Sequence, residues 1–167
     1  MKELLQGRRF GYAPRPPLGM VAAGLGIGVT LLDLMAWFQW GARDTNGFVV
    51  GAFALGAATA MVGALATLAA VAEWVDVPDD ERSLARLDFI AALVATLIYA
   101  ISSVIRSGEL GAAGASPAPL LISIAGLAVL LVDGVIAANL YSAREWEVIE
   151  EEEERPERHR RRRTAAR

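Results

Sequence analysis

Residues 120–141 read LLISIAGLAVLLVDGVIAANLY, an apolar run in which Asp133 is the single charged residue. A helix needs about 20 mainly apolar residues to cross a hydrocarbon core about 30 Å thick. The run meets that length, and it lacks the polar stripe that a soluble helix presents to water. We therefore expect residues 120–141 to form a transmembrane helix.

Three earlier windows have the same character, namely residues 18–40, 48–75 and 87–105. Short connections place consecutive helices side by side and antiparallel. The sequence thus predicts an all-α integral membrane protein with four transmembrane helices in an up-down antiparallel bundle. It divides into a cytoplasmic amino-terminal tail (1–17), a transmembrane domain (18–141) and a charged cytoplasmic tail (142–167).

Composition supports a membrane protein and excludes several kinds of site. Hydrophobic residues make up 54% of the chain, and the mean hydropathy is +0.40. There are no cysteines, so this chain can hold no disulfide, iron–sulfur cluster or cysteine-ligated zinc. The one histidine, His159, lies in the tail, which excludes a bis-histidine haem inside the chain. We expect no catalytic residues, no metal and no cofactor, and the protein is not expected to be an enzyme.

Lysine and arginine predict the orientation, because cytoplasmic loops and tails carry the excess. The first and third loops hold one arginine each, Arg43 and Arg106. The inner segments hold many more: Lys2, Arg8, Arg9, Arg15, Arg82, Arg86, Arg144, Arg155, Arg158, Arg160, Arg161, Arg162, Arg163 and Arg167. Both termini are therefore expected on the cytoplasmic side.

Asp33 and Asp133 lie well inside their apolar windows. A carboxylate at that depth costs about 3 kcal/mol on insertion scales, so such acids suggest a proton relay or ion coordination. The alternative is a packing role, with each acid neutral or hydrogen-bonded to a neighbour such as Thr30. Arg106 can reach Asp33 from the outer rim by snorkelling. Asn139 is a further candidate for a buried polar residue.

Small and polar residues predict how the helices associate. Small residues at four-residue spacing let helices approach closely in lipid, either within the chain or in a dimer, and we favour packing within the chain. The candidates are Gly24, Gly28, Gly47, Gly51 and Gly56. Polar stripes on the second and third helices are expected to face the interior. At the inner boundary, Glu73 and Asp88 are expected to form solvated pairs near Arg82 and Arg86.

The carboxy-terminal tail has an acidic run, Glu150 to Glu154, followed by a basic one. A helical extension with acid-first pairs would be partly self-neutralising. It could dock a protein partner, or the basic cluster Arg160, Arg161, Arg162 and Arg163 could hold anionic lipid. A disordered tail that only fixes topology is the alternative. Nucleic-acid binding is not expected, because the acidic run precedes the basic one and the tail is tethered to the membrane.

Several short motifs resemble a known family. They are Leu32-Asp33-Leu34, Glu73-Trp74, Asp76-Val77-Pro78, Arg82 with Arg86, Arg106, and Ala137-Ala138-Asn139-Leu140-Tyr141. Together they resemble the bacterial four-helix membrane family called domain of unknown function 2231, over most of Leu18 to Val148. Family members usually have Asp where Glu73 stands, His near Asp88 and an acid at Asn139. The resemblance implies the four-helix fold and the bacterial cytoplasmic (inner) membrane, and the departures weaken any ligand or redox role.

These features favour a non-catalytic accessory or scaffold subunit of a larger membrane complex, which the resemblance suggests is a respiratory or redox one. Its expected partners are membrane lipids and other membrane proteins. The alternative is a small proton- or ion-translocating module that uses Asp33 and Asp133. A third possibility is a holder of lipid or of a hydrophobic cofactor between the helices.

Overall fold

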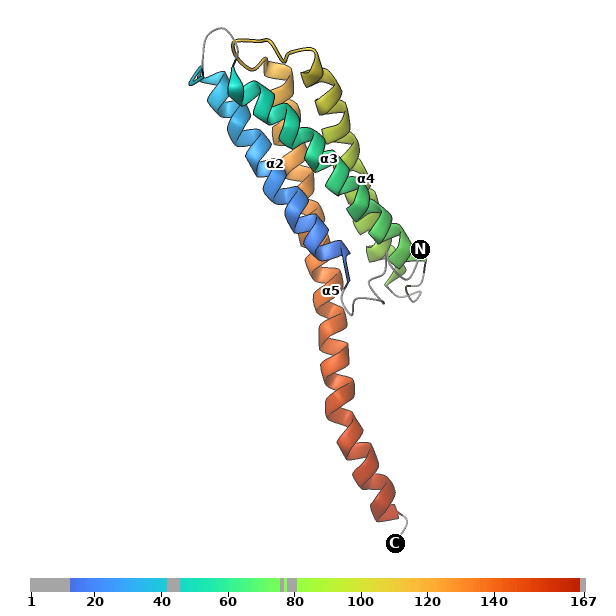
Figure 1. The fold of residues 1–167 in the computed structure, drawn as a ribbon. Coiled ribbons are helices and arrows are strands. Elements are labelled where there is room, and N and C mark those ends of the chain that lie inside the picture. The colour runs from blue at the N-terminus through green and yellow to red at the C-terminus, as the bar shows by residue number, and fades with distance from the viewer. Residues whose placement is uncertain (1–12, 42–45, 76, 78–80, 166–167) are drawn as a thin grey trace.

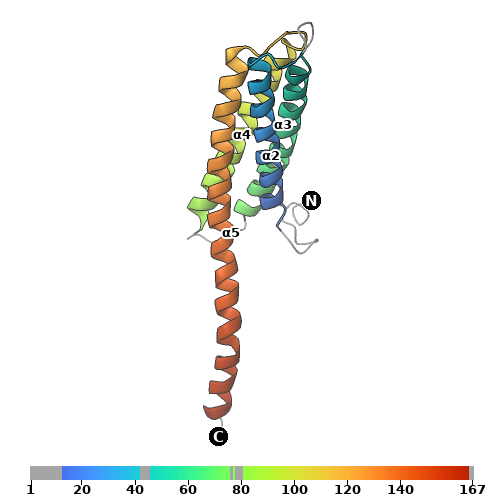
Figure 2. The same ribbon diagram turned by 90° about the vertical axis from the view of Figure 1, so that its left-hand side faces the viewer.

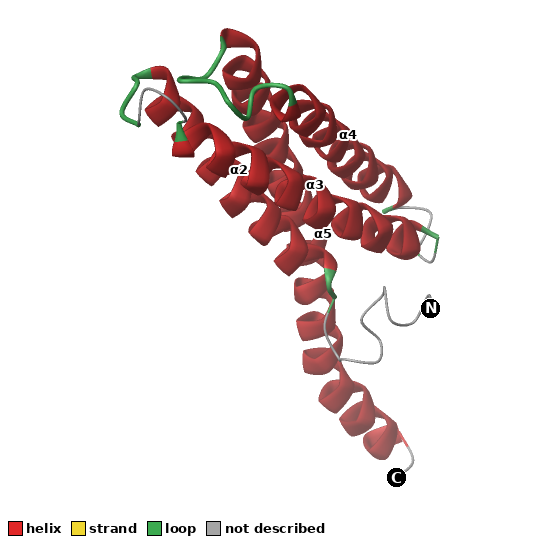
Figure 3. Cartoon of the chain, turned by 45° about the horizontal axis from the view of Figure 1, so that its top comes forward, coloured by secondary structure: helices red, strands yellow, loops and turns green. Residues whose placement is uncertain are grey.

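The structure, a computed structural model, describes residues 13–41, 46–75, 77 and 81–165, and beyond Tyr141 it describes the backbone alone. All regular structure in these segments is helical (Figure 3). The helices are α2 (Arg15–Trp37), α3 (Gly47–Trp74), α4 (Arg82–Ser107) and α5 (Pro117–Ala165).

The four helices form an up-down bundle in which each helix packs against two neighbours (Figures 1 and 2). Helix α2 packs against α3 and α5, and α4 packs against the same two helices, so α2 and α4 lie diagonally across the bundle. Each helix contains a segment long and apolar enough to cross a membrane. The predicted fold, an all-helical four-helix membrane bundle, is confirmed, and the chain is a multi-pass membrane protein.

The helix boundaries differ from the predicted windows in a consistent way. Helix α2 begins at Arg15 rather than at residue 18, because prolines occupy its first positions, where a missing N–H costs nothing. Helix α4 begins at Arg82 rather than at residue 87. Helix α5 begins at Pro117 and continues without a break to Ala165, well past the predicted end at residue 141. In α2 and α4 the apolar windows mark the lipid-facing part of the helix and miss its charged first turn.

The bundle interior is built from small residues packed around one large ring. Tyr99 of α4 is fully buried, in a cluster with Ala22, Val29 and Leu130. A methyl group on Gly26 would lie 2.7 Å from the Tyr99 hydroxyl oxygen, so only glycine leaves room for the ring there. Most large apolar side chains point outward instead, as expected for helices that face lipid.

The predicted glycine contacts divide into two groups. Methyl groups on Gly28, Gly51 and Gly56 would lie 2.9, 3.1 and 3.3 Å from side chains of neighbouring helices, so these glycines mark close packing within the chain. Methyl groups on Gly24 or Gly47 would meet no described atom within 4 Å. The small-residue pattern therefore overstates the contact surface, because glycine also occurs on the lipid-facing side.

Candidate functional site

The first cluster of buried charges, the Arg106 cluster, lies where α4 ends and α5 begins. The Arg106 guanidinium donates through both terminal nitrogens to Asp33, with 2.6 Å between Nη2 and Oδ2. Nη2 also donates to the Pro119 carbonyl oxygen at 3.0 Å, and Nε donates to Ser102 Oγ at 3.0 Å. Asp33 and Arg106 are 1% and 2% exposed. The predicted Arg106 to Asp33 pair is confirmed, whereas the suggested partner Thr30 is wrong, because its hydroxyl donates to backbone carbonyls.

The second cluster, the Arg15 cluster, lies at the opposite end of the bundle. Arg15 donates from Nε to Asp88 Oδ2 at 3.0 Å and from Nη2 to Asp88 Oδ1 at 2.8 Å. Nη2 also donates to Asp133 Oδ1 at 2.6 Å. All three side chains are buried.

Two members of this cluster lie elsewhere than predicted. Arg15 was predicted in the tail, but helix α2 begins at this residue, so the side chain can reach the interior. Asp88 was predicted in a solvated pair near Arg82 and Arg86, but it is only 2% exposed and is paired with Arg15. Asp133, by contrast, is buried as predicted.

The two clusters tie the diagonal helices together at both ends. Helix α2 supplies Arg15 and Asp33, and α4 supplies Asp88 and Arg106. Each pair is separated by roughly five turns of 3.6 residues, so both members lie on the same face of their helix. The order of charge is reversed between the helices, which places an arginine opposite an aspartate at each end. This equal spacing is a signal in the sequence that could have revealed both clusters.

The clusters differ in charge and are far apart. One arginine faces one aspartate in the Arg106 cluster, whereas Arg15 faces the two acids Asp88 and Asp133. The Arg15 cluster therefore carries one surplus negative charge if all three groups are ionised. About 27 Å separate the clusters along the helix axes, by the rise of 1.5 Å per residue. A proton passing between them would need intermediate groups.

Polar residues along α3 and α4 face inward, as the stripes predicted. Thr67 and Thr96 lie 3.2 Å apart, hydroxyl oxygen to hydroxyl oxygen, across the α3 to α4 interface. At the end of α3, the Tyr141 hydroxyl donates to the Glu73 carboxylate, so Glu73 is not limited to solvated pairing with arginine. These contacts stabilise helix packing in a setting where lipid offers no hydrogen bonds.

Other predicted residues lie outside the two clusters. Asn139 is exposed on α5, where Nδ2 donates to the Val135 carbonyl oxygen at 2.8 Å, so its predicted burial is wrong. Arg160, Arg161, Arg162 and Arg163 belong to the α5 extension, but their side chains lie outside the described part of the structure. Among the described residues, no group of three or more acidic, histidine or cysteine side chains could hold a metal.

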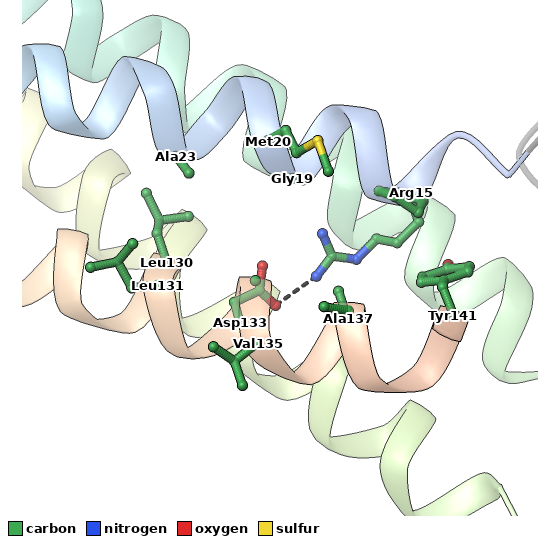
Figure 4. A pocket seen from close by; sticks show the side chains of 13 residues that line it. Arg15, Gly19, Met20, Ala23, Leu130, Leu131, Asp133, Val135, Ala137 and Tyr141 are labelled. Carbon is green, nitrogen blue, oxygen red and sulfur yellow. Dashed lines mark hydrogen bonds and ion pairs between the residues drawn. The ribbon is translucent and has the colours of Figure 1, made fainter. Parts of the chain in front are cut away.

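A groove of about 500 Å³ runs between α2 and α5 beside the Arg15 cluster (Figure 4). Its floor is formed by small residues, including Gly19, Ala23 and Gly134, and its polar end by Arg15 and Asp133. Such a volume falls within the range of small-molecule sites. This groove is not apparent from the sequence, because its two walls come from the first and last helices of the bundle.

The sequence matches no protein-family model, no curated protein and no solved structure. The resemblance to the family called domain of unknown function 2231 therefore stays a prediction.

Proposed function

We propose that the protein is a non-catalytic scaffold, an accessory subunit of a larger complex in the bacterial cytoplasmic membrane. The observation that carries the proposal is the length of α5, which runs unbroken from its membrane-spanning part to Ala165 (Figure 1). The part beyond Tyr141 is about 36 Å long at 1.5 Å per residue. The bundle would anchor this arm, and the arm would present its charged segment to a partner protein.

The proposed orientation follows from the charges. Helix α2 begins at the same end of the bundle at which α5 leaves it (Figures 1 and 2). Helix α4 also begins there with Arg82, and the arginine-rich segment of α5 extends beyond that end. Positively charged segments favour the cytoplasm. We accordingly place both termini, and the α5 arm, in the cytoplasm.

The geometry supports a scaffold better than the alternative, a proton- or ion-translocating module. Asp33 is fully engaged by Arg106, and Asp133 shares Arg15 with Asp88. Acids bound by arginine in this way hold helices in place, and each would have to break an ion pair to carry a proton. Ion or proton flux that disappears in Asp33→Asn and Asp133→Asn vesicles would favour the alternative.

The scaffold proposal is tested by comparing the whole chain with a variant that ends at Tyr141. Both are expressed in the native host and extracted in a mild detergent, and co-purifying membrane proteins are quantified by mass spectrometry. We expect a defined set of proteins to accompany the whole chain and to be lost from the shortened one. Unchanged helical circular dichroism of the bundle is the control. A whole chain that purifies alone, as monomer or homodimer, would contradict the proposal.

A further inference from the structure

The groove between α2 and α5 opens toward the lipid-facing surface of the bundle. Met20 on its rim is 75% exposed, and Leu131 and Val135 are 55% and 62% exposed. Its floor is left open by residues without bulky side chains: a methyl group on Gly134 would meet no described atom within 4 Å. Membrane lipids can therefore enter the groove from the side without leaving the bilayer.

A buried hydrogen-bond donor lies at one end of this groove. Arg15 Nη1 is buried and has no acceptor among the residues that the structure describes, whereas Nε and Nη2 are both bound to aspartates. Gly19 allows this approach, since a methyl group there would lie 2.8 Å from Nη1. A buried guanidinium N–H without an acceptor is costly, so an acceptor supplied by a ligand would be favourable.

The polarity of the groove changes along the helix axes, which is the direction in which membrane lipids extend from headgroup to acyl chain. Arg15 is the first residue of α2, and Ala23 lies about 12 Å further along the helix axis. The wall on α5 likewise runs from Tyr141, where the membrane-spanning part of that helix ends, to Leu130 deeper in the bundle. The groove is therefore polar near the membrane boundary and apolar toward the middle, as are the ester and acyl regions of a membrane lipid.

The charge of the Arg15 cluster decides which acceptor fits. With Asp88 and Asp133 both ionised, the cluster carries one surplus negative charge, which disfavours a further negative group such as a free carboxylate or a phosphate. A neutral carbonyl oxygen accepts the hydrogen bond without that repulsion. The ester carbonyl of a glycerolipid is such a group, and it is linked directly to an acyl chain.

We propose that the groove binds one acyl chain of a glycerolipid and that the adjoining ester carbonyl accepts a hydrogen bond from Arg15 Nη1. Because Nη1 is shielded, a side chain on the rim must move to admit the carbonyl oxygen. Met20 is exposed and unbranched, with three rotatable bonds, and can make this movement. The site is independent of the proposed scaffold role, since it lies in the bundle and not in the α5 arm.

The first test fills the groove without disturbing the fold. Gly134→Leu places a side chain in the groove, and Gly24→Leu is the matched control, since a methyl group at either glycine meets open space and Gly24 lies outside the groove. Each protein is purified from the same membranes, washed in lipid-free detergent and assayed for bound glycerolipid by native mass spectrometry. We expect the wild type and Gly24→Leu to retain a glycerolipid. The amount bound to Gly134→Leu should be lower by about tenfold or more. Equal retention by both variants, or none by the wild type, would overturn the proposal.

The second test leaves the protein unchanged and alters the ligand. Delipidated wild-type protein is titrated with a diester glycerolipid, with the diether lipid of the same chains and headgroup, and with a free fatty acid. The diester is expected to bind about tenfold more tightly than the diether, which lacks the carbonyl, by the strength of a hydrogen bond to a charged donor. The fatty acid carboxylate is expected to bind more weakly than the diester. Equal binding of the two lipids, or tighter binding of the fatty acid, would overturn the proposal.

Discussion

Replacing Arg106 by methionine tests whether the ion pair with Asp33 holds the bundle together. Methionine keeps an unbranched apolar side chain but removes every donor, so the Asp33 carboxylate stays 1% exposed without its cation. A buried charge that loses its partner costs about 3 to 5 kcal/mol, and a carboxylate inside a membrane helix costs about 3 kcal/mol. We expect Arg106→Met to lower the free energy of unfolding by about 3 kcal/mol or more.

A double variant distinguishes the contribution of the ion pair from the cost of leaving one charge without its partner. Asp33→Leu combined with Arg106→Met removes both charges and leaves an apolar contact, which is often as stable as the ion pair that it replaces. Its free energy of unfolding should lie within about 1 kcal/mol of the wild type, so the two substitutions should be strongly non-additive.

Unfolding is followed by titrating sodium dodecyl sulfate into mixed micelles while recording far-ultraviolet circular dichroism and tryptophan fluorescence. Arg86→Met is the matched control, because Arg86 is an exposed arginine on the same helix, and it should change stability by about 0.5 kcal/mol or less. The reasoning is refuted if Arg106→Met stays within about 1 kcal/mol of the wild type, or if the double variant loses the sum of both single effects.

Three further predictions follow from the fold. Asp133→Asn should change stability by about 1 kcal/mol or less, because Arg15 keeps the bidentate Asp88 pair and the surplus negative charge is removed; a loss as large as that of Arg106→Met in the same titration would contradict this. Gly26→Ala should lower the free energy of unfolding by about 1 to 3 kcal/mol, because its methyl group would overlap the buried tyrosine of α4. Gly24→Ala faces open space and should leave stability unchanged, so equal effects of the two variants would refute the packing. Because the chain has no cysteine, Gly111→Cys should react with a membrane-impermeant maleimide in intact cells and Ala165→Cys only after lysis; labelling of both before lysis would disprove the proposed orientation.

The transmembrane helices were predictable from the sequence because crossing a membrane imposes one simple requirement. Crossing a membrane needs a long apolar run, and each of the four helices contains one. The pairing of Arg106 with Asp33 was also predictable, because a long arginine side chain at the end of a helix can extend along the helix toward a buried acid.

The Arg15 cluster was harder to predict, because its members are distant in sequence. Arg15 lies 73 positions from Asp88 and 118 from Asp133, and only the diagonal placement of α2 and α4 and the adjacency of α5 bring them together. The apolar window that located the first helix also excluded Arg15, since a hydropathy criterion discards the charged residue that begins the helix. The prediction for Asn139 was wrong for a different reason. A polar residue in an apolar helix was expected to face the bundle interior, but the Asn139 side chain lies on the exposed side of α5, where it donates a hydrogen bond to a backbone carbonyl oxygen of the same helix.

The reversed charge order on α2 and α4 discriminates between the two ways in which α4 could cross the membrane. With α4 inserted upside down, Arg15 would meet Arg106 at one end, and Asp33 would meet Asp88 at the other. Two attractions would become two repulsions between buried groups that have already lost their water. An unpaired buried charge costs about 3 kcal/mol or more, and this cost would arise at each end of the bundle. The interior charges thus encode the direction of a helix, information that its lipid-facing leucine, isoleucine and valine side chains cannot carry.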